Sequence, residues 1–256
     1  MRKGIGIAGI GGRMGQVLAE EVAAAGVTLT GGIDRPGVAP PAGTRQFADI
    51  AALGAASDIV VDFTHASTVA GHAAALAEAG CGWVLGTTGL SPADDAAVAA
   101  AAQRIAVVQA PNFSPGVNLV LALAERMAAA LPADAYDAEI LEMHHRQKVD
   151  APSGTALGLG RAVARGRGVA LDAVKESGRD GHTGARRPGA IGFAALRGGQ
   201  VVGEHTLLFA AATEHIAITH RAFDRRAFAT GAVRAAIWAV GRPAGLYSMM
   251  DVLGIR

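Results

Sequence analysis

The chain has 256 residues, and 23 Lys plus Arg against 22 Asp plus Glu give a formal net charge of +1. This balance argues against nucleic acid as the main partner, because binding to phosphates requires a strongly basic surface. Apolar residues make up 51% of the chain, but charges and glycines interrupt the apolar runs, which excludes a membrane-spanning segment of about 20 residues. The first residues lack the pattern of a secretory signal, and a single cysteine, Cys81, allows neither an internal disulfide nor a cysteine-based zinc site. These features predict a cytoplasmic enzyme.

The first half of the chain alternates short apolar runs with alanine-rich segments of helical character. Strands are predicted at residues 4–10, 28–34, 58–63, 83–87 and 105–110. Helices are predicted between them at 14–25, 67–79 and 91–102. Alternation of strands and helices of this length is typical of a parallel sheet with helices on both faces.

The pattern changes after Pro111. The predicted elements are a helix at 116–131, a strand at 138–145, a helix at 153–165, and strands at 190–197, 201–209 and 215–220. Successive strands joined by short turns are typical of an antiparallel or mixed sheet. A last helix is predicted at 225–240, before a short tail. The sequence therefore predicts an α/β protein of two lobes, with a boundary near 111–116 and a return to the first lobe near 222–226.

A glycine-rich turn follows the first predicted strand, with the sequence Gly9-Ile10-Gly11-Gly12-Arg13-Met14-Gly15. A strand before it and a helix after it are the context of a dinucleotide-binding fingerprint, whose glycines allow a tight turn, approach of the pyrophosphate and close helix packing. Asp34 ends the second predicted strand, where a carboxylate accepts hydrogen bonds from the adenosine ribose. Arg35 can stack on adenine or pair with a 2′-phosphate, so both NAD and NADP fit. An ordinary βα turn and a surface arginine are the alternative interpretations.

Three further loops follow predicted strands of the same sheet. They are Phe63-Thr64-His65, Gly86-Thr87-Thr88-Gly89 and Ala110-Pro111-Asn112-Phe113-Ser114. Ligands of such sheets bind at the carboxyl ends of the strands, so these loops are candidates for lining a nicotinamide. Taken singly, each is equally consistent with an ordinary loop.

The most informative segment is 142–155, with the sequence EMHHRQKVDAPSGT. On an extended strand, His144 and Lys148 lie on one face and His145 on the other, so both histidines reach one substrate only if the strand ends near His145. The following helix offers its first N–H groups, which belong to Ser153, Gly154 and Thr155. Together these groups indicate an anion site with proton donors, and a polar strand end before a serine N-cap is the alternative. A metal site is disfavoured, because the segment has no HExxH pattern and no thiols.

The combined motifs resemble the dihydrodipicolinate reductase family, or 4-hydroxy-tetrahydrodipicolinate reductases, of bacterial and plant lysine biosynthesis. The resemblance covers nearly the whole chain and is most specific in the HHxxKxDxPSGT pattern at 144–155. The other matching stretches are 8–15, 62–64, 86–89, 112–114, 181–184 and 203–206. The resemblance implies a Rossmann-like dinucleotide-binding domain of residues 1–114 and 223–256. It also implies a substrate-binding and oligomerisation domain of residues 115–222, within a homotetramer.

The activity that this resemblance implies is reduction of 4-hydroxy-tetrahydrodipicolinate, a small dicarboxylate, to tetrahydrodipicolinate by NADH or NADPH in the diaminopimelate pathway. It implies that His144 is an acid/base group and that Lys148 is the proton donor. The predicted substrate contacts are His145, Ser153, Gly154 and Thr155. The predicted cofactor contacts are Gly9, Ile10, Gly11, Gly12, Arg13, Met14, Asp34, Arg35, Gly86, Thr87, Thr88, Ala110, Pro111, Asn112 and Phe113.

Two positions depart from the family pattern near the expected nicotinamide. Ala66 stands where a proline is frequent, and Pro115 stands where an aliphatic residue is common, although neither change removes a group that the chemistry requires. Two other functions stay open: an aspartate-semialdehyde or homoserine dehydrogenase, and a sensor that binds NAD(P)H without turnover. The semialdehyde enzyme needs a nucleophilic thiol, whereas Cys81 precedes a predicted buried strand. A sensor needs no proton donor such as Lys148.

Overall fold

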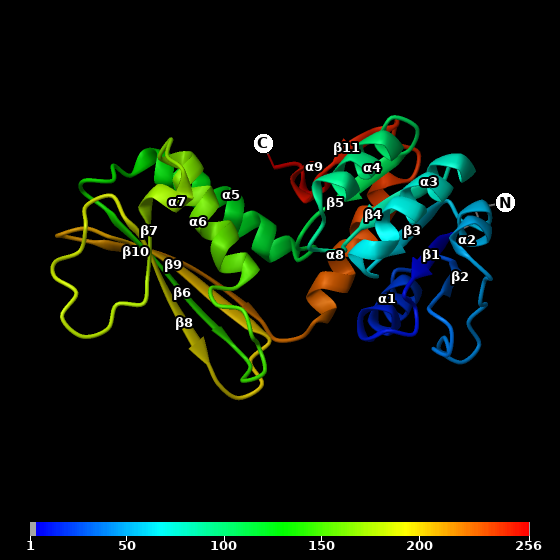
Figure 1. The fold of residues 1–256 in the computed structure, drawn as a ribbon, viewed down its shortest axis with the longest axis horizontal. Helices are drawn as coiled ribbons and strands as arrows, with labels where there is room; N and C mark the ends of the chain where they lie inside the picture. Colours follow the sequence, from blue (N-terminus) through cyan, green and yellow to red (C-terminus); the bar gives the residue numbers. More distant parts are fainter. Residues whose placement is uncertain (1–3, 256) are drawn as a thin grey trace. The chain divides into compact units, whose positions relative to one another are not determined.

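The computed structural model describes residues 4–255, which form two compact units (Figure 1). The first unit comprises the chain up to Pro115 and from Arg225 onward, and the second is Gly116–Asp224. The predicted α/β fold, with a parallel sheet in one unit and a mixed sheet in the other, is confirmed. Among the described residues, no helix has the length and apolar character needed to cross a membrane.

The first unit is built on a six-stranded sheet in the order β11-β5-β4-β3-β1-β2, and every pairing in it is parallel. Its strands are β1 Ile5–Ala8, β2 Leu29–Ile33, β3 Ile59–Asp62, β4 Gly82–Leu85, β5 Ala106–Gln109 and β11 Gly245–Tyr247. From β1 the chain moves to β2 on one side and then to β3 on the other. Such a change of direction creates a ligand-binding crevice at the carboxyl ends of the strands.

Helices cover both faces of this sheet. They are α1 Arg13–Ala24, α2 Ile50–Ala56, α3 Val69–Ala79, α4 Pro92–Ala102, α8 Arg226–Ala239 and α9 Met249–Leu253, with a short 3-10 turn η1 Ala66–Thr68. Because side chains alternate along a strand, Val61 packs in the cluster with α1 and α8, whereas Val60 packs in the cluster with α2, α3 and α4. The sequence did not predict α2, β11 or α9, because elements of seven, three and five residues are too short to show a periodic pattern.

The second unit contains a five-stranded sheet in the order β10-β9-β6-β8-β7. Its strands are β6 Asp137–His144, β7 Lys175–Ser177, β8 Ile191–Arg197, β9 Gly203–Ala210 and β10 His215–Ala222, and its helices are α5 Pro115–Ala130, α6 Gly154–Gly166 and α7 Leu171–Val174. Strand β6 is parallel to β8 and antiparallel to β9, so the sheet is mixed as predicted. Helices α5 and α6 pack on one face, where Ile140 and Phe209 are buried (Figure 1). Alternation along β6 places Glu142 and His144 on that same face.

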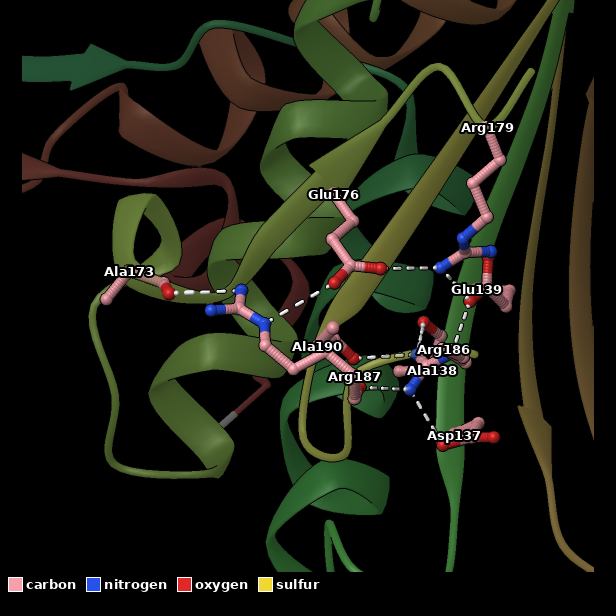
Figure 2. A network of polar contacts seen from close by, with 9 residues as sticks. All are labelled: Asp137, Ala138, Glu139, Ala173, Glu176, Arg179, Arg186, Arg187 and Ala190. Atoms are coloured by element: carbon pink, nitrogen blue, oxygen red, sulfur yellow. Dashed lines mark hydrogen bonds and ion pairs between the residues drawn. The ribbon is translucent and has the colours of Figure 1, made fainter. Parts of the chain in front are cut away.

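An arginine–carboxylate network fastens the segment between β7 and β8 to β6 (Figure 2). Both terminal nitrogens of Arg179 donate to Glu139, each at 2.9 Å. Arg186 donates to Glu139 at 2.8 Å and to Asp137 at 2.7 Å. Burial raises the pKa of Glu139, but the bonds from the two arginines outweigh it, so the net pKa is lowered. Gly192 on β8 leaves room for this carboxylate, since a Cβ there would lie 1.9 Å from its Oε2.

Candidate active site

The glycine-rich turn joins β1 to α1 by a path that only glycine allows at two points. Gly9 has a φ of +81°, in the left-handed region, and its carbonyl accepts a bond of 3.0 Å from the N–H of Gly12. A Cβ at Gly15 would lie 2.1 Å from the carbonyl oxygen of Gly9, so α1 packs directly on the turn. The first N–H groups of α1 therefore lie at the carboxyl edge of the sheet, where helix geometry favours an anion.

Asp34 lies beside this turn, as the fingerprint predicts. Its Oδ2 accepts from the N–H of Gly11 at 2.8 Å, and its Oδ1 accepts from the N–H of Arg35 at 2.8 Å. Each carboxylate oxygen has a second acceptor site, so the carboxylate can also accept from two hydroxyl groups. The side chain of Arg35 is exposed at the same edge.

The loops after β3, β4 and β5 meet around the ring of Phe63. That ring lies 5.6 Å from the ring of Phe113, centroid to centroid, and 2.5 Å from the position that a Cβ at Gly86 would take. Within the next loop, Oγ1 of Thr87 is buried and has no hydrogen-bond partner among the described residues. Because a buried hydroxyl is rarely left without a partner, this atom fits a polar group of a bound cofactor.

A cavity of about 380 Å³ opens beside these loops in the first unit. Its lining residues are Arg13, Met14, Phe63, Pro111, Asn112, Phe113, Arg225 and Phe228. Arg225 and Phe228 were missed in the sequence analysis, because they precede or begin a helix far along the chain and belong to no fingerprint. The only signal that could have found them was the predicted return of the chain to the first lobe.

In the second unit, Glu142 is the centre of a buried polar cluster. Its carboxylate accepts a bond from Nδ1 of His144 and two bonds of 2.9 Å from Arg197 of β8. The N–H of Ser153 adds a fourth bond at 3.1 Å. The side chain of Glu142 is only 1% exposed, and this burial raises its pKa. The hydrogen bonds from Arg197, His144 and Ser153 have the larger effect, so the pKa is lowered overall. Glu142 is therefore an ionised carboxylate at neutral pH.

The imidazoles of this cluster are neutral at the same pH. Burial lowers the pKa of His144, Glu142 partly opposes it, and the charges of Lys148 and Arg197 lower it further. Burial also lowers the pKa of His205, to about 4. The ring of His205 stands edge-on to that of His144 at 5.0 Å. Because Nδ1 of His144 donates to Glu142, Nε2 is the nitrogen of His144 that is left for a reacting group.

This cluster also has the spacing of a metal site, since ligand atoms of Glu142, His144 and His205 lie within 4.8 Å of one another. Arg197, however, donates to both oxygens of the Glu142 carboxylate. A guanidinium on that carboxylate repels a second cation. The cluster therefore fits proton transfer better than metal binding.

Lys148 lies beyond the end of the strand, so the prediction that Lys148 and His144 share one face of an extended strand is wrong. Strand β6 ends at His144, and the chain turns so that the N–H of Lys148 donates to the carbonyl of His145 at 3.1 Å. The side chain of Lys148 is 21% exposed, and its ammonium pairs with Asp150 at 2.8 Å. The hydrogen bond from Lys148 is the main cause that lowers the pKa of Asp150. Because β6 ends at His144, the alternation of side chains along a strand no longer requires His145 to point away from His144.

Ser153 also requires a correction. The sequence suggested that its N–H holds an anion, but that N–H donates to Glu142, while its hydroxyl caps the N–H of Ala156 at 3.2 Å and bonds His205 at 3.0 Å. Ser153 is the N-cap of α6, as predicted. Its role is thus to join α6 to the Glu142 cluster. Gly154 is exposed at the first position of α6, and Thr155 follows it half-buried.

Comparison with known proteins decides the family. The model described as dihydrodipicolinate reductase, N-terminus, matches residues 3–113, and the corresponding C-terminus model matches residues 116–253. The chain belongs to the dihydrodipicolinate reductase family. Within this reductase family, a 4-hydroxy-tetrahydrodipicolinate reductase of Granulibacter bethesdensis is 70% identical, over 98% of this chain and 97% of the relative. One of Acidiphilium cryptum is 64% identical, with 98% and 97% covered.

A solved structure of a reductase shares the fold of this chain. The dipicolinate-bound dihydrodipicolinate reductase from Paenisporosarcina sp. TG-14 superposes with a TM-score of 0.79 at 23% identity, covering 96% of this chain and 97% of the other. The family membership disfavours the semialdehyde dehydrogenase alternative. Consistently, Cys81 is buried and packs with the apolar residues of the α2, α3 and α4 face.

Proposed function

We propose that this chain catalyses the reduction of 4-hydroxy-tetrahydrodipicolinate to tetrahydrodipicolinate in the diaminopimelate route to lysine. The relatives with up to 70% identity over nearly the whole chain carry the name of this reductase. The main structural support is a group of polar residues beside the exposed start of α6. It contains Lys148, a neutral His144 and an ionised Glu142. Cationic and N–H donors beside a proton-transfer group suit a dicarboxylate that must be protonated.

The residues of the first unit fit a nicotinamide dinucleotide. The first N–H groups of α1 would hold the pyrophosphate and Asp34 the adenosine ribose. The hydroxyl of Thr87 and the loop 110–113 would receive the nicotinamide end, together with Arg225 and Phe228 of the lining. The bound dinucleotide supplies the hydride, the protein supplies binding, orientation and a proton, and the 4-hydroxyl group of the substrate leaves as water.

The substrate contacts follow from the second unit. Lys148 attracts a carboxylate and delivers the proton, while His145, Gly154 and Thr155 bind the dicarboxylate. Nε2 of His144 exchanges a proton with the ring of the substrate, because Nδ1 of His144 already donates to Glu142. Ser153 contributes indirectly, by holding Glu142 and the start of α6 in place.

Turnover of the synthesised pathway intermediate tests this function. We expect the purified chain to consume NADH or NADPH only when 4-hydroxy-tetrahydrodipicolinate is present, and dipicolinate to inhibit competitively with that substrate. Aspartate semialdehyde and homoserine serve as control substrates and should give no turnover. Binding of the dinucleotide without any turnover of the pathway intermediate would instead support the sensor.

We propose that both NADH and NADPH are used, with Arg35 meeting the 2′-phosphate. Arg35→Ala should raise the KM for NADPH by about tenfold, the scale of one charge-assisted hydrogen bond, and leave the KM for NADH nearly unchanged. Arg45→Ala is a matched control, because Arg45 lies over the ring of Phe47 at 4.4 Å in the same connection after β2. Equal losses for the two cofactors in Arg35→Ala would show that Arg35 does not read the phosphate.

We also propose that the chain acts as a cytoplasmic homotetramer through the open face of the mixed sheet. On this face Leu141 is 44% exposed and Leu196 is 49% exposed. Leu196 pairs with Met143, so it lies on the same side as Leu141. Leu141→Glu should reduce the mass measured by light scattering, since a charge would then be buried between copies. A tetrameric mass for this variant would place the contact elsewhere.

A further inference from the structure

Asp62, the last residue of β3, has a carboxylate that is completely buried, with 0% of the residue exposed. Its Oδ2 accepts from Nδ1 of His72 on α3 at 2.7 Å and from Nε1 of Trp83 on β4 at 3.3 Å. Its Oδ1 accepts from the N–H of Thr64 at 3.0 Å and from the hydroxyl of Thr64 at 2.6 Å. One buried carboxylate therefore joins a helix, a neighbouring strand and the loop after its own strand.

The sheet itself does not require a carboxylate at this position. The residues that pair with Asp62 in the neighbouring strands are Ala8 and Leu85, which are both apolar and buried. Burying a charge is costly unless hydrogen bonds compensate it, and an aliphatic side chain could supply none of these bonds. Two of the four bonds hold His72 and Trp83, and the other two, both from Thr64, hold the loop after β3.

The loop that Asp62 holds lies against the candidate cofactor site. The hydroxyl of Thr64 continues to that of Thr68 at 2.8 Å, and Thr68 donates to the carbonyl of His65 at 2.8 Å. A Cβ at Gly9 would lie 3.3 Å from Cγ2 of Thr64, so Thr64 closes the space beside the glycine-rich turn. The preceding Phe63 lines the cavity described above.

We propose that Asp62 is a positioning residue for the dinucleotide-binding edge. It fixes Thr64 through both of its donors, and Thr64 in turn sets the place of Phe63 against the glycine-rich turn. The role rests on the proposed function, because it concerns the same cofactor. His72 and Trp83 hold Oδ2, so that Oδ1 stays directed at the loop.

Calorimetric titration with NADH tests this role in Asp62→Asn. The amide can no longer accept on both sides, so the loop loses its fixed place and we expect the Kd for NADH to rise at least about tenfold. Dipicolinate inhibition should remain unchanged. Asp58→Asn is the matched control. Asp58 precedes β3 at its other end, and among the described residues its carboxylate accepts only from the N–H of Gly4, at 3.0 Å. Its Kd for NADH should equal that of the parent chain.

A second pair of variants keeps the proposal testable if Asp62→Asn does not fold. Thr64→Val removes the hydroxyl and leaves Asp62 with His72, Trp83 and the backbone N–H of residue 64, whereas Thr64→Ser keeps the hydroxyl. We expect Thr64→Val to weaken NADH binding and Thr64→Ser to restore it. An NADH Kd in folded Asp62→Asn or in Thr64→Val equal to that of the parent would overturn the proposal. Failure of the parent chain to reduce the pathway intermediate while binding NADH would count against the proposed function alone.

Discussion

Lys148→Ala is expected to lower kcat by about a hundredfold or more and to raise KM for the dicarboxylate. The loss in kcat follows from removal of the proton donor, since general acids contribute roughly 10²- to 10⁴-fold. The rise in KM follows from loss of the ammonium that attracts a carboxylate. Steady-state kinetics with the pathway intermediate measure both, and NADH affinity should survive, because the glycine-rich turn belongs to the other unit.

The control for this variant is Lys175→Ala. Lys175 lies in the same unit, on β7, where its ammonium is 5.7 Å from the ring centroid of Phe193. We expect its kcat and KM to match those of the parent chain. A folded Lys148→Ala with normal kcat would contradict the proposed proton transfer and leave only a dinucleotide-binding role.

Glu142→Gln is expected to impair both stability and catalysis. The change leaves Arg197 without its carboxylate in a buried cluster, and loss of one partner of such a pair costs about 3 kcal/mol or more. It also removes the anion that favours a proton on His144, so the pKa of His144 should fall further. The acid limb of the pH profile of kcat/KM should therefore move to lower pH, and kcat should fall at least about tenfold.

Glu139→Gln separates these two effects. Glu139 lies on the same strand and also pairs with two arginines, Arg179 and Arg186, but it does not contact His144. Urea unfolding should show a loss of stability in both variants, whereas only Glu142→Gln should move the pH profile. An unmoved profile in Glu142→Gln would show that Glu142 does not act through His144.

The same cluster predicts how stability depends on pH. Glu142 has a lowered pKa, so its stabilisation is complete above the unfolded value of about 4.3 and disappears as the pH falls through the lower folded value. His205 has a folded pKa of about 4, below the unfolded value of about 6.5. The folded state therefore loses stability between these two values as the pH falls, because the unfolded chain takes up the proton first.

The sequence was sufficient where a local pattern determines the local structure. The turn from Gly9 to Gly15 was predictable because two of its positions require glycine. Few other residues adopt the φ of +81° found at Gly9, and a Cβ at Gly15 would lie 2.1 Å from the carbonyl oxygen of Gly9. Asp34 was predictable because its distance along the chain follows from the length of one helix. Ser153 was recognisable as an N-cap for the same reason, since the preference is local.

Contacts between distant segments were not predictable. Strand alternation was extended to Lys148, although the strand ends at His144, because sequence does not show where a sheet partner stops. The bond from Ser153 to Glu142 and the bond from Arg197 to Glu142 depend on how α6 and β8 pack against β6. Neither has a spacing that a single sequence reveals.

The place of α8 has a consequence for synthesis of the chain. Ala232 and Val233 of α8 are buried with Ile7, Val61 and Val84 of the sheet, yet the whole second unit, Gly116–Asp224, lies between them in sequence. On the ribosome, strands β1 to β5 of the first unit emerge long before α8 exists. Within this cluster of the described residues, α1 is the only helix made before α8, so one apolar side of the nascent sheet stays partly uncovered until residues 226–239 have been translated. Translation thus exposes this face to aggregation and to chaperones until α8 has been made.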